Sequence, residues 1–150
     1  MYENVRAYDT ETHRFSVGNL SPNLVCVSVA GYYPEANPTT PEGARNNMGV
    51  EVVAITTPEK INAVIDSAMA PGVKAVFHNA AFDLAVIANH RPDLISRIFE
   101  KITLGEVSCT KIREKLLNVN DTGDLEFMVT RTGARQKIGY SLADLSAWYL

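Results

Sequence analysis

Two acidic side chains near the start of the chain have the type and spacing to bind a cation. Asp9 and Glu11 are separated by one residue, in a stretch that runs from Val5 to Thr12. In a β-strand, residues two apart project from the same face, so both carboxylates would leave the sheet side by side. A hard cation such as Mg²⁺ or Mn²⁺, which prefers oxygen ligands, would relieve their repulsion. The pair predicts a metal site; the alternative is a strand end followed by a solvated turn.

A second acidic motif lies downstream, at Asn79 and Asp83. Residues 73–78 have the composition of a buried strand, and Asn79 follows where a helix is expected to begin. Asp83 would then lie one turn into this helix, from where its carboxylate reaches back over the sheet edge toward Asp9. The alternative is that Asn79 only caps the helix and Asp83 complements the helix dipole. If the carboxylates converge, two ions about 3.5–4 Å apart would support phosphoryl transfer, because they activate water and stabilise the leaving oxygen.

Together the two motifs resemble those of the DnaQ-like (DEDD) 3′–5′ exonuclease domains. Asp9 and Glu11 match the first motif of that group, and Asn79 with Asp83 matches the second. The resemblance is closest to the N-terminal proofreading domain of phage-type family A DNA polymerases. It implies that Asp9, Glu11 and Asp83 bind two Mg²⁺ or Mn²⁺ ions. It further implies a single-stranded DNA 3′ end as substrate, and a DNA polymerase domain as partner in cis or in trans.

The resemblance runs through most of the 150 residues, including 111–117 and 140–145, and it raises the question of a third motif. Family members carry Tyr-x-x-x-Asp or His-x-x-x-Asp on a late helix, and Tyr140 with Asp144 fits that pattern as a catalytic pair. The favoured interpretation is different, because Ser-Leu-x-x-Leu segments open an earlier helix in the family. Tyr140 is then a loop residue and Asp144 an exposed acid in the first helical turn. On this interpretation the chain is one exonuclease-like domain, residues 1–150, that lacks its C-terminal helices and the third motif.

Substrate contacts are predicted around the same acidic residues. We expect Thr10, Asn79 and Phe82 to contact the terminal nucleotide, and Glu11 to help orient the attacking water. Phe77 and Phe82 have the alternative of lying in the core. Basic side chains in residues 118–137, which have the composition of a loop or weak hairpin, would hold the phosphates of a single strand, unless the loop is simply solvated. They are Arg131, Arg135 and Lys137.

The order of the expected elements predicts an α/β fold with a ribonuclease H-like mixed sheet, in which three antiparallel strands are followed by helix-linked parallel strands flanked by helices. The expected strands are 4–8, 24–33, 49–56, 73–78 and 102–107. The expected helices are 58–69, one that follows Asn79, 92–99, 110–117 and 142–150. Residues 34–47 hold three prolines and a glycine, which predicts a loop.

Composition narrows the class of protein. The net charge of −3 argues against tight, nonspecific binding of duplex DNA, which depends on Lys and Arg releasing counterions. Cys26 and Cys109 show no metal-binding spacing, so we expect free buried thiols in a reducing cytoplasm, that of a bacterial host if the chain is phage-encoded. No stretch has the length of a membrane span, and no membrane partner is expected. Two alternatives stay open: an RNA exonuclease similar to RNase D or oligoribonuclease, and an inactive nuclease-derived module that binds nucleic acid or a partner.

Overall fold

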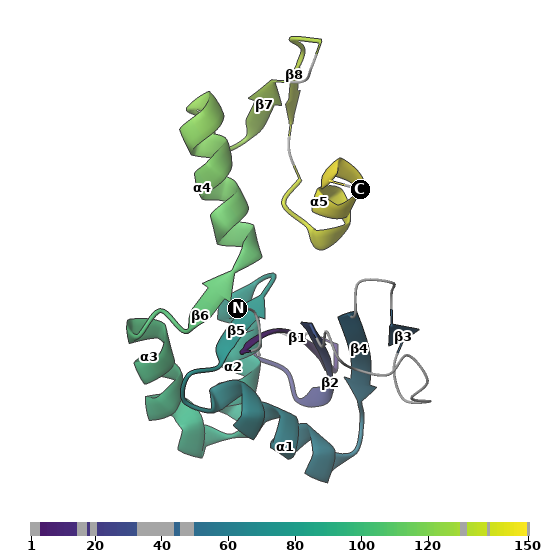
Figure 1. The fold of residues 1–150 in the computed structure, drawn as a ribbon, viewed down its shortest axis with the longest axis vertical. Helices are drawn as coiled ribbons and strands as arrows, with labels where there is room; N and C mark the ends of the chain where they lie inside the picture. The colour runs from purple at the N-terminus through teal and green to yellow at the C-terminus, as the bar shows by residue number, and fades with distance from the viewer. Residues whose placement is uncertain are drawn as a thin grey trace. The chain divides into compact units, whose positions relative to one another are not determined.

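The fold is known from a computed structural model, in which the chain divides into two compact units, residues 1–108 and 109–150 (Figure 1). The sequence predicts a single domain, and that stays a prediction. The structure describes residues 4–14, 18, 21–32, 44–45, 50–129, 132–137 and 139–149.

The first unit is built on a mixed sheet with helices packed against it (Figure 1). Its strands are β1 (Val5–Thr12), β2 (Leu24–Tyr32), β3 (Ala44–Arg45), β4 (Val50–Ile55), β5 (Lys74–Phe77) and β6 (Val107–Cys109). Its helices are α1 (Pro58–Met69), α2 (Ala80–His90), the short 3₁₀ helix η1 (Pro92–Leu94) and α3 (Ile95–Thr103). The strand order is β3-β4-β2-β1-β5-β6, with β1 antiparallel to β2 and parallel to β5. The predicted mixed α/β class is therefore confirmed.

Strand β1 separates a covered face of the sheet from an open one. Tyr8 and Thr10 are buried, whereas Ala7, Asp9 and Glu11 are exposed, which is the alternation expected of a half-buried strand. On the covered face the ring of Tyr8 packs against that of Phe77, with 5.8 Å between centroids. Further core side chains on this face and its helices are Val27, Ile61, Ile65, Ala75, Val86 and Ile87.

Helices α1 and α2 begin where their sequences predict. Thr57 precedes α1 and Pro58 occupies its first turn, where a missing backbone N–H costs nothing. Asn79 occupies the N-cap position of α2, as predicted, although its side chain makes no capping hydrogen bond. The hydroxyl of Ser67 on α1 accepts a 2.8 Å hydrogen bond from Arg6, which ties this helix to the start of β1.

In the first unit, the predicted strand 102–107 and the predicted loop 34–47 differ from the structure. Residues 102–107 were expected to form a strand, but Ile102 and Thr103 complete α3 and the strand begins only at Val107. Ile95, Phe99 and Ile102 recur at helical spacing with Ile98, so the helical period prevails over the local β-propensity of Ile-Thr. In the predicted loop 34–47, residues 44–45 form β3, and 34–43 and 46–47 lie outside the described residues.

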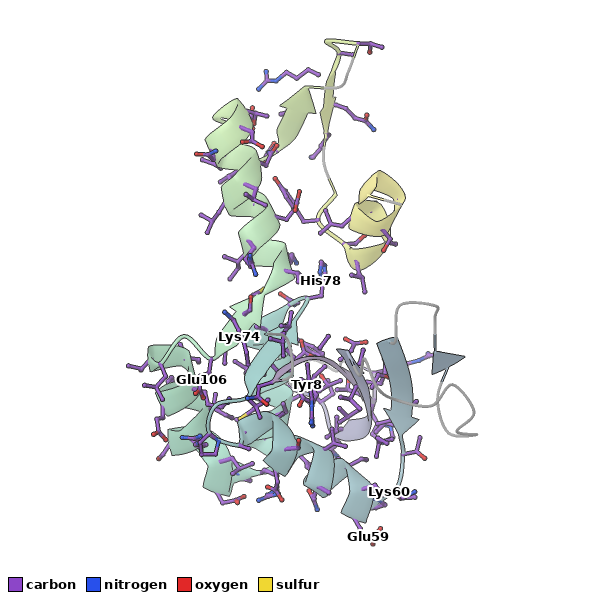
Figure 2. The ribbon with its side chains drawn as sticks, viewed as in Figure 1. Tyr8, Glu59, Lys60, Lys74, His78 and Glu106 are labelled. Carbon is purple, nitrogen blue, oxygen red and sulfur yellow. The ribbon has the colours of Figure 1, made fainter. Side chains whose placement is uncertain are left out.

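A fully buried lysine joins two turns of the first unit. The ammonium of Lys101 donates to the backbone oxygens of Ala70 and Val73, at 2.9 and 2.6 Å, and pairs with Glu106 at 2.9 Å. Glu106, labelled in Figure 2, also accepts a 3.0 Å bond from the backbone N–H of Gly72. The Lys101 hydrogen bond, followed by the Gly72 bond, holds the pKa of Glu106 below its usual value. Each buried donor of the lysine therefore has a partner, which a buried charge requires.

Replacing Lys101 by Met is expected to lower the free energy of unfolding by about 3 kcal/mol, because two backbone oxygens and one carboxylate lose their donor together. The matched control is Lys74→Met, since Lys74 is exposed on β5 (Figure 2). Its effect should stay within about 0.5 kcal/mol. Urea denaturation of both variants measures the difference, and equal losses would contradict the role given to Lys101.

The second unit holds α4 (Thr110–Thr122), β7 (Phe127–Val129), β8 (Arg135–Lys137) and α5 (Leu142–Tyr149). Helix α4 ends at Gly123, whose φ of 71° is the left-handed conformation that glycine adopts without strain. Strands β7 and β8 pair antiparallel. Residues 118–137 were expected to form a loop or weak hairpin; the hairpin is confirmed, but residues 118–122 belong to α4.

Buried Asn118 organises the loops of the second unit. Its Nδ2 donates to the backbone oxygen of Asp124 at 2.6 Å and to the Tyr140 hydroxyl at 3.1 Å, and that hydroxyl donates to the backbone oxygen of Leu125 at 2.8 Å. Lys115 lies over the Tyr140 ring, 5.3 Å from its centroid. These contacts hold α4, the turn before β7 and the segment before α5 together. Across both units, none of the helices in the described ranges has the length and apolar character needed to cross a membrane.

Candidate metal centre

Asp9 and Glu11 occupy the same open face of β1, as predicted. Both are exposed, whereas Thr10 between them is 5% exposed. In the register with β2, Asp9 lies opposite Ser28 and Glu11 lies opposite Cys26. The residues opposite the two carboxylates on β2 therefore have small side chains. Both carboxylates lie in the central part of the sheet.

Asp83 reaches β1 at the point where its neighbour β5 no longer pairs with it. The ladder between the two strands runs from Val5–Lys74 to Ala7–Val76. The backbone oxygen of Asn4 accepts from β5, so by the two-residue period the N–H of Thr10 points to that same edge. Beyond the ladder this N–H donates to Oδ1 of Asp83 at 3.0 Å, and the Thr10 hydroxyl donates to the same atom at 2.7 Å. The second acidic motif is thereby bonded to the strand that carries the first, across a sequence separation of 73 residues.

The Asp83 carboxylate is held in an unfavourable place for a charge. It is 3% exposed, and burial raises its pKa above the usual value, against the lowering effect of its hydrogen bonds with Thr10. The negative charge of Asp9 raises the pKa of Asp83 further, so these two carboxylates lie within electrostatic range of each other. A cation between them would offset both effects.

Cys26 lies beside the acidic pair, which the sequence alone does not indicate. It is half-buried rather than buried as expected, and it forms no disulfide. Burial raises the pKa of its thiol, and the charges of Glu11 and Asp9 raise it further. Only the pairing register of β1 and β2 brings Cys26 opposite Glu11, and no local pattern predicts that register.

The donor chemistry of the site suits a hard divalent cation. Asp9, Glu11 and Asp83 offer carboxylate oxygens. The charge of Asp9 raises the pKa of Asp83, so these two lie within electrostatic range. Glu11 shares the face of Asp9, and Cys26 lies opposite it in the register of β1 with β2. Within the described ranges, no three side chains of Asp, Glu, His or Cys form a ready-made set of ligands. In this structure Asp9 and Glu11 project from the open face of β1, whereas Asp83 is bonded to the Thr10 side chain on the covered face, so the three carboxylates do not close around a single point.

The residues expected to contact substrate have different environments. Thr10 is buried and bonded to Asp83, Asn79 is exposed at the start of α2, and Phe82 is half-buried. His78, between β5 and Asn79, is also half-buried (Figure 2). Phe77 is 1% exposed, so the core interpretation holds for it and stacking on a base does not. The substrate contacts of Thr10, Asn79 and Phe82 stay predictions.

Tyr140 and Asp144 belong to the second unit, where both have local partners. The backbone N–H of Ser141 donates to Oδ2 of Asp144 at 3.3 Å, and the backbone N–H of Asp144 donates to the Ser141 hydroxyl at 3.1 Å. This reciprocal arrangement is a capping box for α5. Any side chain at Gly139 would strike Asp144, because its Cβ would lie 2.1 Å from Oδ2. Tyr140 therefore precedes the helix and Asp144 is an exposed acid of its first turn, as the favoured interpretation has it.

Of the basic side chains predicted to hold phosphates, Arg135 has partners within the second unit. Arg135 forms an ion pair with Asp124 and lies over the ring of Phe127, 4.6 Å from its centroid. Lys137 is exposed on β8, and Arg131 lies outside the described residues. Backbone bonds from residues 126 and 127 and the pair with Arg135 lower the pKa of Asp124, so this carboxylate stays charged beside the arginine. Binding of a nucleic-acid phosphate at Arg135 would compete with Asp124.

Comparisons with models of protein families, with curated proteins and with solved structures found no match to this chain.

Proposed function

We propose that the chain is a metal-dependent 3′–5′ exonuclease with a ribonuclease H-like sheet, and that Asp9, Glu11 and Asp83 hold two Mg²⁺ or Mn²⁺ ions. The observation that carries the proposal is the pair of hydrogen bonds from Thr10 to Asp83. They join two acidic motifs from distant parts of the chain at one strand. Asp9 and Glu11 flank Thr10 on that strand and project from its other face, so one three-residue stretch carries two carboxylates and binds the third.

The three acidic residues would have different roles in phosphodiester hydrolysis. Bound ions would supply an activated water and charge stabilisation at the leaving oxygen. Asp9 and Asp83 would share the cation that lowers their mutual repulsion. Glu11, exposed on the open face, would accept a proton from the attacking water or orient it. The open face around Asp9 and Glu11 gives a nucleotide access to both carboxylates.

The substrate and the partner of the proposed exonuclease rest on the resemblance to proofreading domains. A DNA 3′ end agrees with the net charge of −3, because gripping a few terminal nucleotides needs few basic residues. A polymerase in cis or in trans would need an apolar contact surface. In the first unit, large apolar side chains are exposed on α3: Ile95, Phe99 and Ile102. In the second unit, separately, they are exposed on α4: Ile112, Leu116 and Leu117. Exposed apolar side chains in such number are typical of interaction surfaces.

A second candidate is a nuclease-derived module that binds nucleic acid or a protein without cleaving it. It is favoured by the local roles of Tyr140 and Asp144, since the hydroxyl of one and the carboxylate of the other are used within the second unit. The exonuclease domains that the chain resembles carry a third acidic motif in addition to those that Asp9, Glu11 and Asp83 match. The two candidates differ in one measurable property, which is cleavage.

The test is degradation of single-stranded DNA by the purified chain. Oligonucleotides labelled at the 5′ end report on shortening from the 3′ end, and a 2′-O-methyl 3′ terminus and an RNA of equal sequence probe the sugar. The proposal expects a ladder of 5′-labelled products in Mn²⁺ or Mg²⁺ and none in EDTA. Binding of the oligonucleotide with no cleavage in either metal would favour the inactive module, and preference for RNA would favour the RNA exonuclease.

A further inference from the structure

Helix α4 belongs to a unit that buries little apolar surface of its own. Among the side chains that the structure describes, the buried apolar ones all belong to the first unit, and Asn118 is the one buried residue of the second. Exposed large apolar side chains nevertheless gather in the second unit: Ile112, Leu116, Leu117, Val119, Leu125 and Leu142. The first four of these lie on α4. Such a concentration is typical of a surface that binds a partner.

Three of the exposed side chains form a stripe along α4. Ile112, Leu116 and Val119 recur at the spacing of one helix face, and they are 56%, 64% and 38% exposed. Asn118 lies on a different side of the helix, where its Nδ2 donates to the backbone oxygen of Asp124 and to the hydroxyl of Tyr140. The stripe is therefore turned away from the contacts that hold the second unit together.

Positive charges border this stripe. By the helical period of about 3.6 residues, Arg113 and Lys115 fall on its two sides. Glu114 and Asp121, which are two turns apart, fall on the far side of the helix. Lys115 lies over the ring of Tyr140, 5.3 Å from its centroid. Arg113 is exposed, and it forms no ion pair with any residue in the described part of the chain.

We propose that α4 is a docking helix, and that its partner is a protein with an apolar groove edged by acidic side chains. Amphipathic helices bind in apolar grooves through anchors at the spacing of Ile112, Leu116 and Val119. The positive charges beside the stripe favour acidic groove edges and disfavour basic ones. The inference does not depend on the proposed metal centre, because α4 carries none of the residues of that centre.

The same charges disfavour two other occupants of the stripe. A second copy of α4 would bring further cations to the contact, and like charges across an interface repel. Helices that lie on anionic membranes carry Lys and Arg over a strongly charged polar face. The far side of α4 holds the acids Glu114 and Asp121 instead. A protein groove with acidic edges fits both the stripe and its borders.

The test measures binding of the full chain to a labelled synthetic probe by fluorescence anisotropy. The acidic probe is a designed helical hairpin with Leu along the groove between its helices and Glu along both edges, and the basic probe has Lys in place of Glu. Leu116→Gln removes the centre of the stripe, and Arg113→Glu reverses one border charge. The matched controls are Leu104→Gln and Lys60→Glu, because both residues are exposed in the first unit.

The expected result is binding of the acidic probe at least about tenfold tighter than binding of the basic probe. Leu116→Gln should weaken binding of the acidic probe at least about tenfold, because burial of a leucine side chain is worth that factor. Arg113→Glu should weaken it roughly threefold, the size of an exposed ion pair. Both controls should bind as the wild type does, and circular dichroism checks that each variant keeps its helix content.

Three results would overturn the inference. The first is no binding of the acidic probe by the folded chain, or equal binding of the two probes. The second is a dimer in sedimentation velocity that Leu116→Gln dissociates, because a second copy would then cover the stripe. The third is tighter binding to phosphatidylglycerol vesicles than to the acidic probe, because a lipid surface would then be the occupant.

Discussion

Replacing Asp83 by Asn is expected to stabilise the metal-free chain and to abolish its stabilisation by Mn²⁺. The amide oxygen of Asn can accept the same two hydrogen bonds from Thr10, so the link between α2 and β1 remains. The variant removes a buried charge that burial and the charge of Asp9 both disfavour. A rise of roughly 3 °C in melting temperature at pH 7 is the expected size for a chain of this length.

The pH dependence of this effect has a definite sign. The raised pKa of Asp83 means that the folded chain holds its proton more tightly than the unfolded chain, in which the ordinary value is 3.8. Stability of the wild type therefore falls as the pH rises from about 3.8 through the raised pKa, and the penalty persists at neutral pH. The advantage of Asp83→Asn should accordingly be present at pH 7 and vanish below about pH 4.

Mn²⁺ should stabilise the wild type and leave the stability of Asp83→Asn unchanged. At a free concentration of 100 times the dissociation constant, an ion that binds only the folded state adds about 2.7 kcal/mol to wild-type stability, and it should add nothing to Asp83→Asn. Asp66→Asn is the control, because Asp66 is exposed on α1 and pairs with Arg91. Differential scanning fluorimetry with and without Mn²⁺ measures both effects. If Asp83→Asn melts below the wild type without metal, the carboxylate is serving the fold alone and the argument from its burial is wrong.

Asp9→Asn is expected to lower the rate of any nuclease activity by at least about 10³-fold and to leave the fold unchanged. A catalytic ion supplies several kcal/mol of transition-state stabilisation. Losing about 4 kcal/mol of it would lower the rate about 10³-fold. Because Asp9 is exposed, the melting temperature of the Asp9→Asn variant should stay close to that of the wild type. Single-turnover cleavage of 5′-labelled DNA in Mn²⁺ measures the rate, with Glu59→Gln as control because Glu59 is exposed in the first turn of α1.

A second readout of Asp9→Asn does not require activity. The charge of Asp9 contributes to raising the pKa of the Cys26 thiol, so its removal should lower that pKa and speed alkylation of Cys26 at a fixed pH. Mass spectrometry of the modified peptide separates Cys26 from Cys109. An unchanged alkylation rate together with full nuclease activity would mean that Asp9 lies away from both the thiol and the reacting centre.

The sequence predicts those parts of the site that depend on local period. Alternation along β1 places Asp9 and Glu11 on one face because neighbours in a strand always point to opposite sides. The start of α2 after Asn79 follows from the end of the apolar strand, and it places Asp83 in the first helical turn. Both features need only the backbone geometry of a single element, which is why they can be predicted.

The remaining features depend on how elements meet, and the sequence does not contain that information in any local form. The bond between Thr10 and Asp83 exists because β5 leaves β1 after Ala7, and Cys26 reaches Glu11 through the strand register. Lys101 has the sequence context of a solvated helical residue. It is buried because the turn of residues 70–73 supplies two backbone oxygens and Glu106 supplies a charge. Chain topology decides all three cases.

Titration of the chain with Mn²⁺, followed by the loss of the free-ion electron paramagnetic resonance signal, tests the central claim most directly. The account predicts binding by the wild type that is lost in Asp9→Asn and in Asp83→Asn and is retained in Asp66→Asn. It also predicts that Mg²⁺ displaces the bound Mn²⁺, because both ions prefer the same oxygen ligands. Binding that is equal in all four proteins, or absent from the folded wild type, would contradict a metal centre at Asp9, Glu11 and Asp83.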